Sequence, residues 1–180
     1  MKKILVVTNF LLNTASKVES YNIEEIQEES KLRKELLKEV FEEDIQLLQL
    51  PCPEFTLYGE NRWGHVKSQF DNTFFRNHCR QILQPIITQL EEYYRDKEKF
   101  KLLDIVAIDG SPSCGYNFTC DGNWGGELAG CPNLIEKIES IKLVEEPGVF
   151  MEELEKLLEE KNIKIEIKTL KDEITYLKNL

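Results

Sequence analysis

Three short runs of aliphatic residues, separated by long stretches of helical periodicity, constrain the fold of this 180-residue chain more than any other feature. The runs are KILVVT at 3–8, DIQLLQL at 44–50 and KLLDIVAID at 101–109. The first is apolar on both faces, as a strand buried inside a parallel sheet would be. Strands that alternate with helices predict a three-layer, Rossmann-like α/β domain, with a mostly parallel sheet and helices on both faces.

Amphipathic helices are predicted over 23–42, 73–96 and 149–161, where apolar residues recur with helical spacing. Asp71 or Asn72 can cap the second of these helices, and Pro85 predicts a kink or a break inside it.

The remaining segments connect these elements. We expect a loop or lid at 55–70, a short helix or a strand-like segment at 133–143, an edge strand at 163–170 because its residues alternate in polarity, and a short helical tail. No repeat or linker interrupts the chain, so residues 1–180 are predicted to form one domain.

The charge of the chain excludes several kinds of partner. The formal net charge is -10, which argues against a nucleic-acid polymer or an anionic membrane as partner. No run approaches the roughly 20 apolar residues of a membrane span, and no small-residue cleavage site follows the apolar start. We therefore expect a cytoplasmic location and a small-molecule substrate; a homodimer is compatible with the sequence.

Three segments that follow the predicted strands carry residues able to do chemistry. They are Asn9 to Asn13, Cys52 to Glu54, and Gly110 to Cys114. In a parallel sheet, the loops at the carboxyl ends of the strands converge and form the ligand site. The fold should therefore bring these three segments to one rim.

Cys52 and Glu54 lie in the sequence PCPE. The flanking prolines make the backbone of Cys52 rigid, which suits a fixed ligand, although a buried thiol at a strand end explains it equally. Glu54 is a candidate general acid or base if the rim is poorly solvated, because burial raises the pKa of a carboxyl group; a solvated loop glutamate is the alternative.

The glycine-rich stretch from Asp109 to Cys131 holds three of the five cysteines. Ser111 and Ser113 place hydroxyl groups beside Cys114, where they can cradle an anion or cap a helix. The spacing of Cys114, Cys120 and Cys131 matches no zinc-ribbon or ferredoxin pattern, since no C-x2-C pair is present. A structural zinc site built from these three cysteines is a weaker alternative.

The order of motifs resembles the DUF523 and thiouracil-desulfidase group, over nearly the whole chain. The motifs are NFLLN, QLPCPE, FFRNHCR, IDGSPSCG, NWGGE and GVFMEEL. The resemblance implies a [4Fe–4S] cluster held by three cysteines, with an open iron that accepts sulfur from a thiolated nucleobase. By match, Cys52 and Cys114 would be two of the ligands, and Glu54 and Ser111, with Ser113 less favoured, would be catalytic.

One position departs from the pattern of that group. The first ligand of the group stands in a segment like HCLLN, and here Phe10 occupies the position of the cysteine. Phenylalanine cannot ligate iron, so either Cys120 or another thiol replaces it, or the cluster is absent or labile. The first hypothesis is therefore an iron–sulfur desulfidase that acts on a small thiolated heterocycle by cleaving a C–S bond. The second is a cluster-free homologue that binds a small molecule or a partner at the same strand-end pocket.

Overall fold

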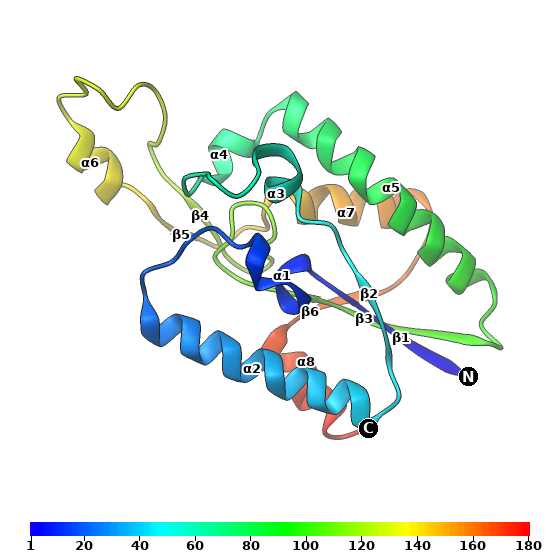
Figure 1. Cartoon of the computed structure of the whole chain (residues 1–180). Helices are drawn as coiled ribbons and strands as arrows, with labels where there is room; N and C mark the ends of the chain where they lie inside the picture. The colour runs from blue at the N-terminus through cyan, green and yellow to red at the C-terminus, as the bar shows by residue number, and fades with distance from the viewer.

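A computed structural model describes residues 1–180, and a four-stranded parallel sheet lies at its centre (Figure 1). The strands are ordered β2-β1-β3-β6, and all three pairings are parallel. Their bounds are β1 (Lys2–Val7), β2 (Gln46–Gln49), β3 (Phe100–Ala107) and β6 (Glu166–Thr169). The predicted α/β architecture is confirmed, and β6 is the edge strand expected from the alternation at 163–170.

Helices cover both faces of the sheet, as Figure 1 shows. On one face, α2 (Ile23–Glu42) packs beside α8 (Leu170–Leu177); on the other, α5 (Thr73–Arg95) packs beside α7 (Val149–Glu160). Successive residues of β1 alternate between the two cores: Val6 belongs to the α5–α7 core, and Leu5 and Val7 belong to the α2–α8 core. No helix is both long and apolar enough to cross a membrane.

The structure corrects several details of the prediction. Pro85 does not break α5, which continues through it, because Pro85 and Gln81 lie on the exposed side where water can satisfy the freed carbonyl group. The segment 55–70 is not all loop: it contains the end of α3 (Pro53–Tyr58) and all of α4 (Lys67–Phe70). The ambiguous segment 133–143 forms both a helix, α6 (Leu134–Glu139), and most of a strand, β5 (Lys142–Val144).

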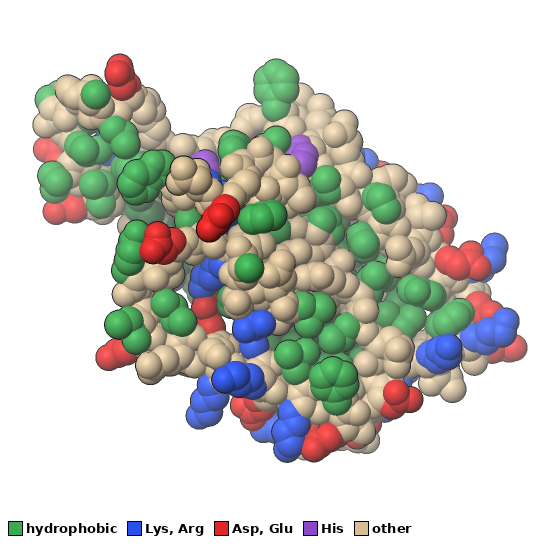
Figure 2. Space-filling model, viewed as in Figure 1, with side chains coloured by type: hydrophobic (Ala, Val, Ile, Leu, Met, Phe, Trp, Pro, Cys, Tyr) green, Lys and Arg blue, Asp and Glu red, His purple; other side chains and the backbone are tan.

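Residues 119–144 form an arm that extends from the body of the molecule (Figure 1). The arm consists of β4 (Thr119–Asp121), α6 and β5, with β4 and β5 paired antiparallel. No residue of α6 is buried, and apolar side chains are visible on the arm in Figure 2. The strand β4 lies inside the glycine-rich stretch, where the residues show no strand pattern.

The strand order creates a switch point between β1 and β3. The chain leaves β1 toward β2 on one side and returns through β3 on the other. Two short elements follow β1 at this edge, α1 (Asn9–Leu12) and a 3-10 turn, η1 (Thr14–Ser16). Open α/β sheets bind ligands in the crevice at such a point, outside the carboxyl ends of the strands.

A buried carboxyl group on α8 makes stability depend on pH. Glu173 of α8 is fully buried and neither of its carboxylate oxygens has a hydrogen-bond partner. Burial, with a smaller contribution from the negative charge of Asp104, raises the pKa of Glu173 from 4.5 to about 7. Lys168 offsets this only in part, because its Nζ lies 2.8 Å from Asp104 Oδ2 and 3.9 Å from Glu173 Oε2.

We expect the free energy of unfolding to fall by about 2–3 kcal/mol between pH 5 and pH 8, because the folded chain holds a proton on Glu173 that the unfolded chain releases near pH 4.5. Urea unfolding of Glu173→Gln should show a smaller loss over the same range and a higher stability at pH 8. Glu166→Gln, at an exposed carboxyl group near the same lysine, is the control. Equal pH dependence in the wild type and Glu173→Gln would contradict the assignment.

Candidate functional site

A cavity of about 820 Å³ lies at the switch point between β1 and β3. It is lined by residues from all three of the strand-end segments predicted to meet there. They include Asn9, Phe10, Cys52, Glu54, Gly110, Ser111, Ser113 and Cys114. The predicted convergence is therefore confirmed, because parallel pairing places the three carboxyl ends at one edge of the sheet.

Glu54 and Ser113 form the closest polar contact between two of these segments. The Ser113 hydroxyl donates a hydrogen bond of 2.6 Å to Glu54 Oε1, and both residues are buried. Ser111 has no hydrogen bond to Glu54. Instead, its Oγ accepts the backbone N–H of Ser113 at 3.3 Å and that of Cys114 at 3.1 Å. The structure therefore places Ser113, the less favoured serine of the sequence prediction, in direct contact with Glu54.

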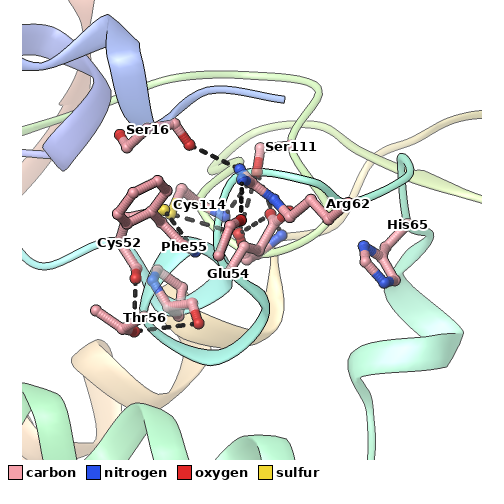
Figure 3. A network of polar contacts seen from close by, with 12 residues as sticks. Ser16, Cys52, Glu54, Phe55, Thr56, Arg62, His65, Ser111 and Cys114 are labelled. Atoms are coloured by element: carbon pink, nitrogen blue, oxygen red, sulfur yellow. Dashed lines mark hydrogen bonds and ion pairs between the residues drawn. The ribbon is translucent and has the colours of Figure 1, made fainter. Parts of the chain in front are cut away.

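Arg62 completes a buried polar network around Glu54 (Figure 3). Its Nε lies 3.5 Å from Glu54 Oε2, and its two terminal nitrogens donate to the carbonyl oxygens of Gly59 at 2.9 Å and Ser16 at 2.7 Å. The Arg62 side chain is 5% exposed, so solvent screens this pair little. One arginine therefore joins the loop after α3 to η1 and holds the carboxylate between them.

The first turn of α7 supports the loop that carries the serines. The backbone N–H groups of Phe150 and Met151 donate to the Ser113 carbonyl oxygen, at 3.0 and 3.3 Å. Gly148 precedes this turn, and its N–H donates to the Gly115 carbonyl oxygen at 2.8 Å. The GVFMEEL segment thus has a structural role: it fixes the backbone of the turn from Ser111 to Gly115.

Helix α3 is fixed in a similar way from α5. His78 Nε2 lies 3.1 Å from the Pro53 carbonyl oxygen and 3.0 Å from Thr56 Oγ1. The side chain of Cys52 caps α3 by accepting the Phe55 N–H at 3.4 Å. These contacts set the position of α3 and, with it, the direction in which Glu54 points.

Three cysteines line the cavity. Burial raises the pKa of the half-buried Cys52 and Cys120 thiols, and raises the pKa of the buried Cys114 thiol well above its usual value of 9. The Cys120 thiol donates to the His65 carbonyl oxygen at 3.4 Å. Cys131 lies on the arm, outside the cavity, with its thiol 3.4 Å from Asn133 Oδ1.

Phe10 forms part of the cavity wall. It is 9% exposed and packs in the α2–α8 core. Lys17 Nζ lies 4.9 Å and Arg33 Cζ 5.6 Å from the centre of its ring, within the range of cation–π attraction. The segment in which the sequence resemblance leads us to expect a first cysteine ligand therefore presents a packed aromatic ring.

The side chains around the cavity are not gathered into a set of three metal ligands in this structure. Cys52 and Cys114 lie in the expected segments, but Phe10 supplies no ligand atom, and the Cys120 thiol is directed at a backbone carbonyl. No group of three His, Cys, Asp or Glu side chains is arranged to hold a metal ion. The set Cys114, Cys120 and Cys131, considered for zinc, is likewise not brought together.

Among the residues that line the cavity, Thr8, Arg62 and His65 are polar residues to which the sequence assigned no role. Arg62 carried no signal, since a single arginine in a loop resembles any surface charge. Thr8 was visible only as a polar residue that interrupts the first apolar run. His65 was noticed in the predicted lid, but nothing in its spacing linked it to Glu54.

Comparison with known proteins yields one curated relative. It is described as an uncharacterized protein, MJ0003, of Methanocaldococcus jannaschii. The two are 31% identical over 113 residues, which make up 63% of this chain and 67% of the relative. No family model matches the chain, and no solved structure matches it.

Proposed function

This chain belongs to the same family as the uncharacterized protein MJ0003, and from the geometry of the strand-end cavity we propose that it binds a small, uncharged heterocycle of the thionucleobase type without an iron–sulfur cluster. The observation that carries the proposal is Phe10. Its packed ring occupies the position of the first cluster ligand, while Glu54 and Ser113 are still held together at 2.6 Å across the cavity floor.

The floor of the cavity suits a ligand without charge. The Glu54 carboxylate is offset by the Arg62 guanidinium, and burial raises the pKa of Cys52 and Cys114, which keeps both thiols protonated at neutral pH. An anionic or cationic ligand would lose its hydration here without meeting an opposite charge.

The rim favours a free base over a nucleotide. Two lysines and four glutamates line it, and the lysines are already paired: Lys17 Nζ lies 2.5 Å from Glu29 Oε2, and Lys171 Nζ lies 2.9 Å from Glu28 Oε1. The two remaining glutamates, Glu19 and Glu25, leave the rim negative. A phosphate group at the mouth would therefore be repelled.

Glu54 and Ser113 supply the polar contacts within the floor. The Glu54 carboxylate can accept a hydrogen bond from a ring N–H group. The single hydrogen of the Ser113 hydroxyl is donated to Glu54, so the Ser113 oxygen can accept a second ring N–H group, or the hydroxyl can turn from Glu54 and donate to a neighbouring carbonyl or thiocarbonyl group. In the same position they can move a proton to or from the bound ring.

A second candidate, the iron–sulfur desulfidase, is favoured by one specific observation. Cys120 lines the same cavity as Cys52 and Cys114, so a third thiol is available near the other two. That candidate requires the Cys120 side chain to leave the His65 carbonyl oxygen and a metal to deprotonate three thiols. A cluster held in this way would supply the chemistry that accepts sulfur from the substrate.

Calorimetric titration of metal-free protein separates the two candidates. We expect 2-thiouracil to bind at one site per chain, and 2-thiouridine 5′-monophosphate to bind at least tenfold more weakly because of the negative rim. Glu54→Gln should weaken 2-thiouracil binding about tenfold or more, since it removes a charged acceptor. Glu60→Gln, which changes an exposed carboxyl group that lies in the loop after α3 and does not line the cavity, is the matched control.

The second arm of the experiment is anaerobic reconstitution with iron and sulfide. Under the first candidate, the protein retains well below one cluster per chain and binding does not depend on iron. About one cluster per chain, lost in Cys52→Ser and Cys120→Ser but retained in Cys131→Ser, together with no binding by metal-free protein, would replace the first candidate with the second.

A further inference from the structure

Two of the buried polar atoms without partners belong to residues of the cavity. Four side-chain oxygen or nitrogen atoms are buried without a hydrogen-bond partner, and two of them belong to Glu173. The other two are Thr8 Oγ1 and His65 Nδ1, and both residues line the cavity. A buried polar group without a partner costs about 1–3 kcal/mol, so two at one cavity require a physical explanation.

The backbone of Thr8 is fully engaged, but its side chain is not. Its N–H donates to the Val106 carbonyl oxygen at 3.1 Å, and its carbonyl oxygen accepts the Leu11 N–H at 3.1 Å. Thr8 stands at the N-cap position of α1, yet its hydroxyl makes no capping bond. With 1% of its surface exposed, it meets no bulk water either. The sheet therefore places an unused hydroxyl at the end of β1, on a residue that lines the same cavity as Glu54 and Ser113.

The imidazole of His65 is positioned by contacts with two aromatic rings, and its Nδ1 makes no hydrogen bond. Its ring centre lies 4.9 Å from that of Tyr58 and 4.8 Å from that of Phe70. Burial lowers the pKa of His65, so the ring is neutral at pH 7 and has one donor and one acceptor nitrogen. Figure 3 shows the residue beyond Arg62, at the side of the network around Glu54.

We propose that Thr8 and His65 are ligand-binding residues, and that each hydrogen-bonds to a different edge of the heterocycle bound over Glu54 and Ser113. The inference rests on the proposed function and narrows its ligand. A hydroxyl and a neutral imidazole can each donate or accept one hydrogen bond, so they select a ring with both N–H donors and carbonyl or thiocarbonyl acceptors, and they discriminate against rings alkylated at nitrogen.

Both atoms become accessible through small side-chain rotations. Rotation of Thr8 about χ1 exchanges its hydroxyl with its methyl group, and a flip of the His65 ring exchanges Nδ1 with Cδ2 while the ring stays beside the same two aromatic neighbours. Neither rotation moves the backbone. Binding can therefore convert two unsatisfied groups into two hydrogen bonds.

Thr8→Val and His65→Phe test the inference, because each keeps the shape of the side chain and removes its hydrogen-bonding atoms. We expect each to weaken 2-thiouracil binding about three- to tenfold, the effect of one hydrogen bond. The Tm of the ligand-free variants should be equal to or higher than that of the wild type, because an unsatisfied buried group has been removed. Thr8→Ser, which keeps the hydroxyl, should retain most of the affinity.

A change in the ligand provides the complementary test. The probe 1,3-dimethyl-2-thiouracil has no N–H donor and should bind the wild type more weakly than 2-thiouracil. The two probes should differ less with Thr8→Val and with His65→Phe.

A lower Tm of the free variants with unchanged affinity would show a structural role and overturn the inference while leaving the proposed function intact. Absence of binding by the wild type would overturn the proposed function and this assignment together.

Discussion

Gly148→Ala is expected to lower the free energy of unfolding by about 3 kcal/mol. A Cβ at this position would lie 2.4 Å from the Ser113 carbonyl oxygen and 2.9 Å from that of Pro112. Both contacts are with backbone atoms, so no side-chain rotation can relieve them. The φ of Gly148 is -71°, which alanine adopts readily, so the cost arises from contact and not from backbone strain.

Urea unfolding measures this effect, and Gly64→Ala is its matched control. The Cβ of an alanine at position 64 would meet no atom within 4 Å, so that variant should stay within about 0.5 kcal/mol of the wild type. Because Ser113 must move away from α7 in Gly148→Ala, 2-thiouracil affinity should fall together with stability. Equal stability of the two alanine variants would show that the residue before α7 is not in close contact with the turn from Ser111 to Gly115.

Arg62→Met is expected to lower the free energy of unfolding by about 3 kcal/mol. The change leaves the buried Glu54 carboxylate without its cation and removes the donors to the carbonyl oxygens of Gly59 and Ser16. Ser113 remains as the one hydrogen-bond donor to Glu54. An unpaired charge that stays buried is far more costly than an exposed one, because water no longer solvates it.

A double-mutant cycle identifies the origin of this loss. If the unpaired carboxylate is its main cause, Glu54→Gln combined with Arg62→Met should be more stable than Arg62→Met alone. Arg95→Met removes a comparable but exposed ion pair with Glu92 and should cost less than about 1 kcal/mol. A loss in Arg62→Met no larger than that in Arg95→Met would argue against a buried pair at the site.

Much of the site was predictable because its residues follow strands. Cys52, Glu54, Ser111 and Cys114 stand directly after apolar runs, and parallel pairing brings such positions together whatever the details of the loops. The departure at Phe10 was also visible in the sequence. Arg62 was not predictable in the same way, because it reaches Glu54 from the loop between two short helices that has no strand periodicity.

Local periodicity by itself determined the long helices α2, α5 and α7, the strands of the central sheet and their alternation, and therefore the layered α/β architecture, because side-chain spacing selects a helix or a strand independently of distant residues. Only the tertiary structure decided which serine meets Glu54, since the partners are 59 positions apart and the choice depends on how α7 fixes the turn. It also decided that Cys120 enters the cavity and Cys131 does not, because β4 packs against the body while the rest of the arm extends away from it.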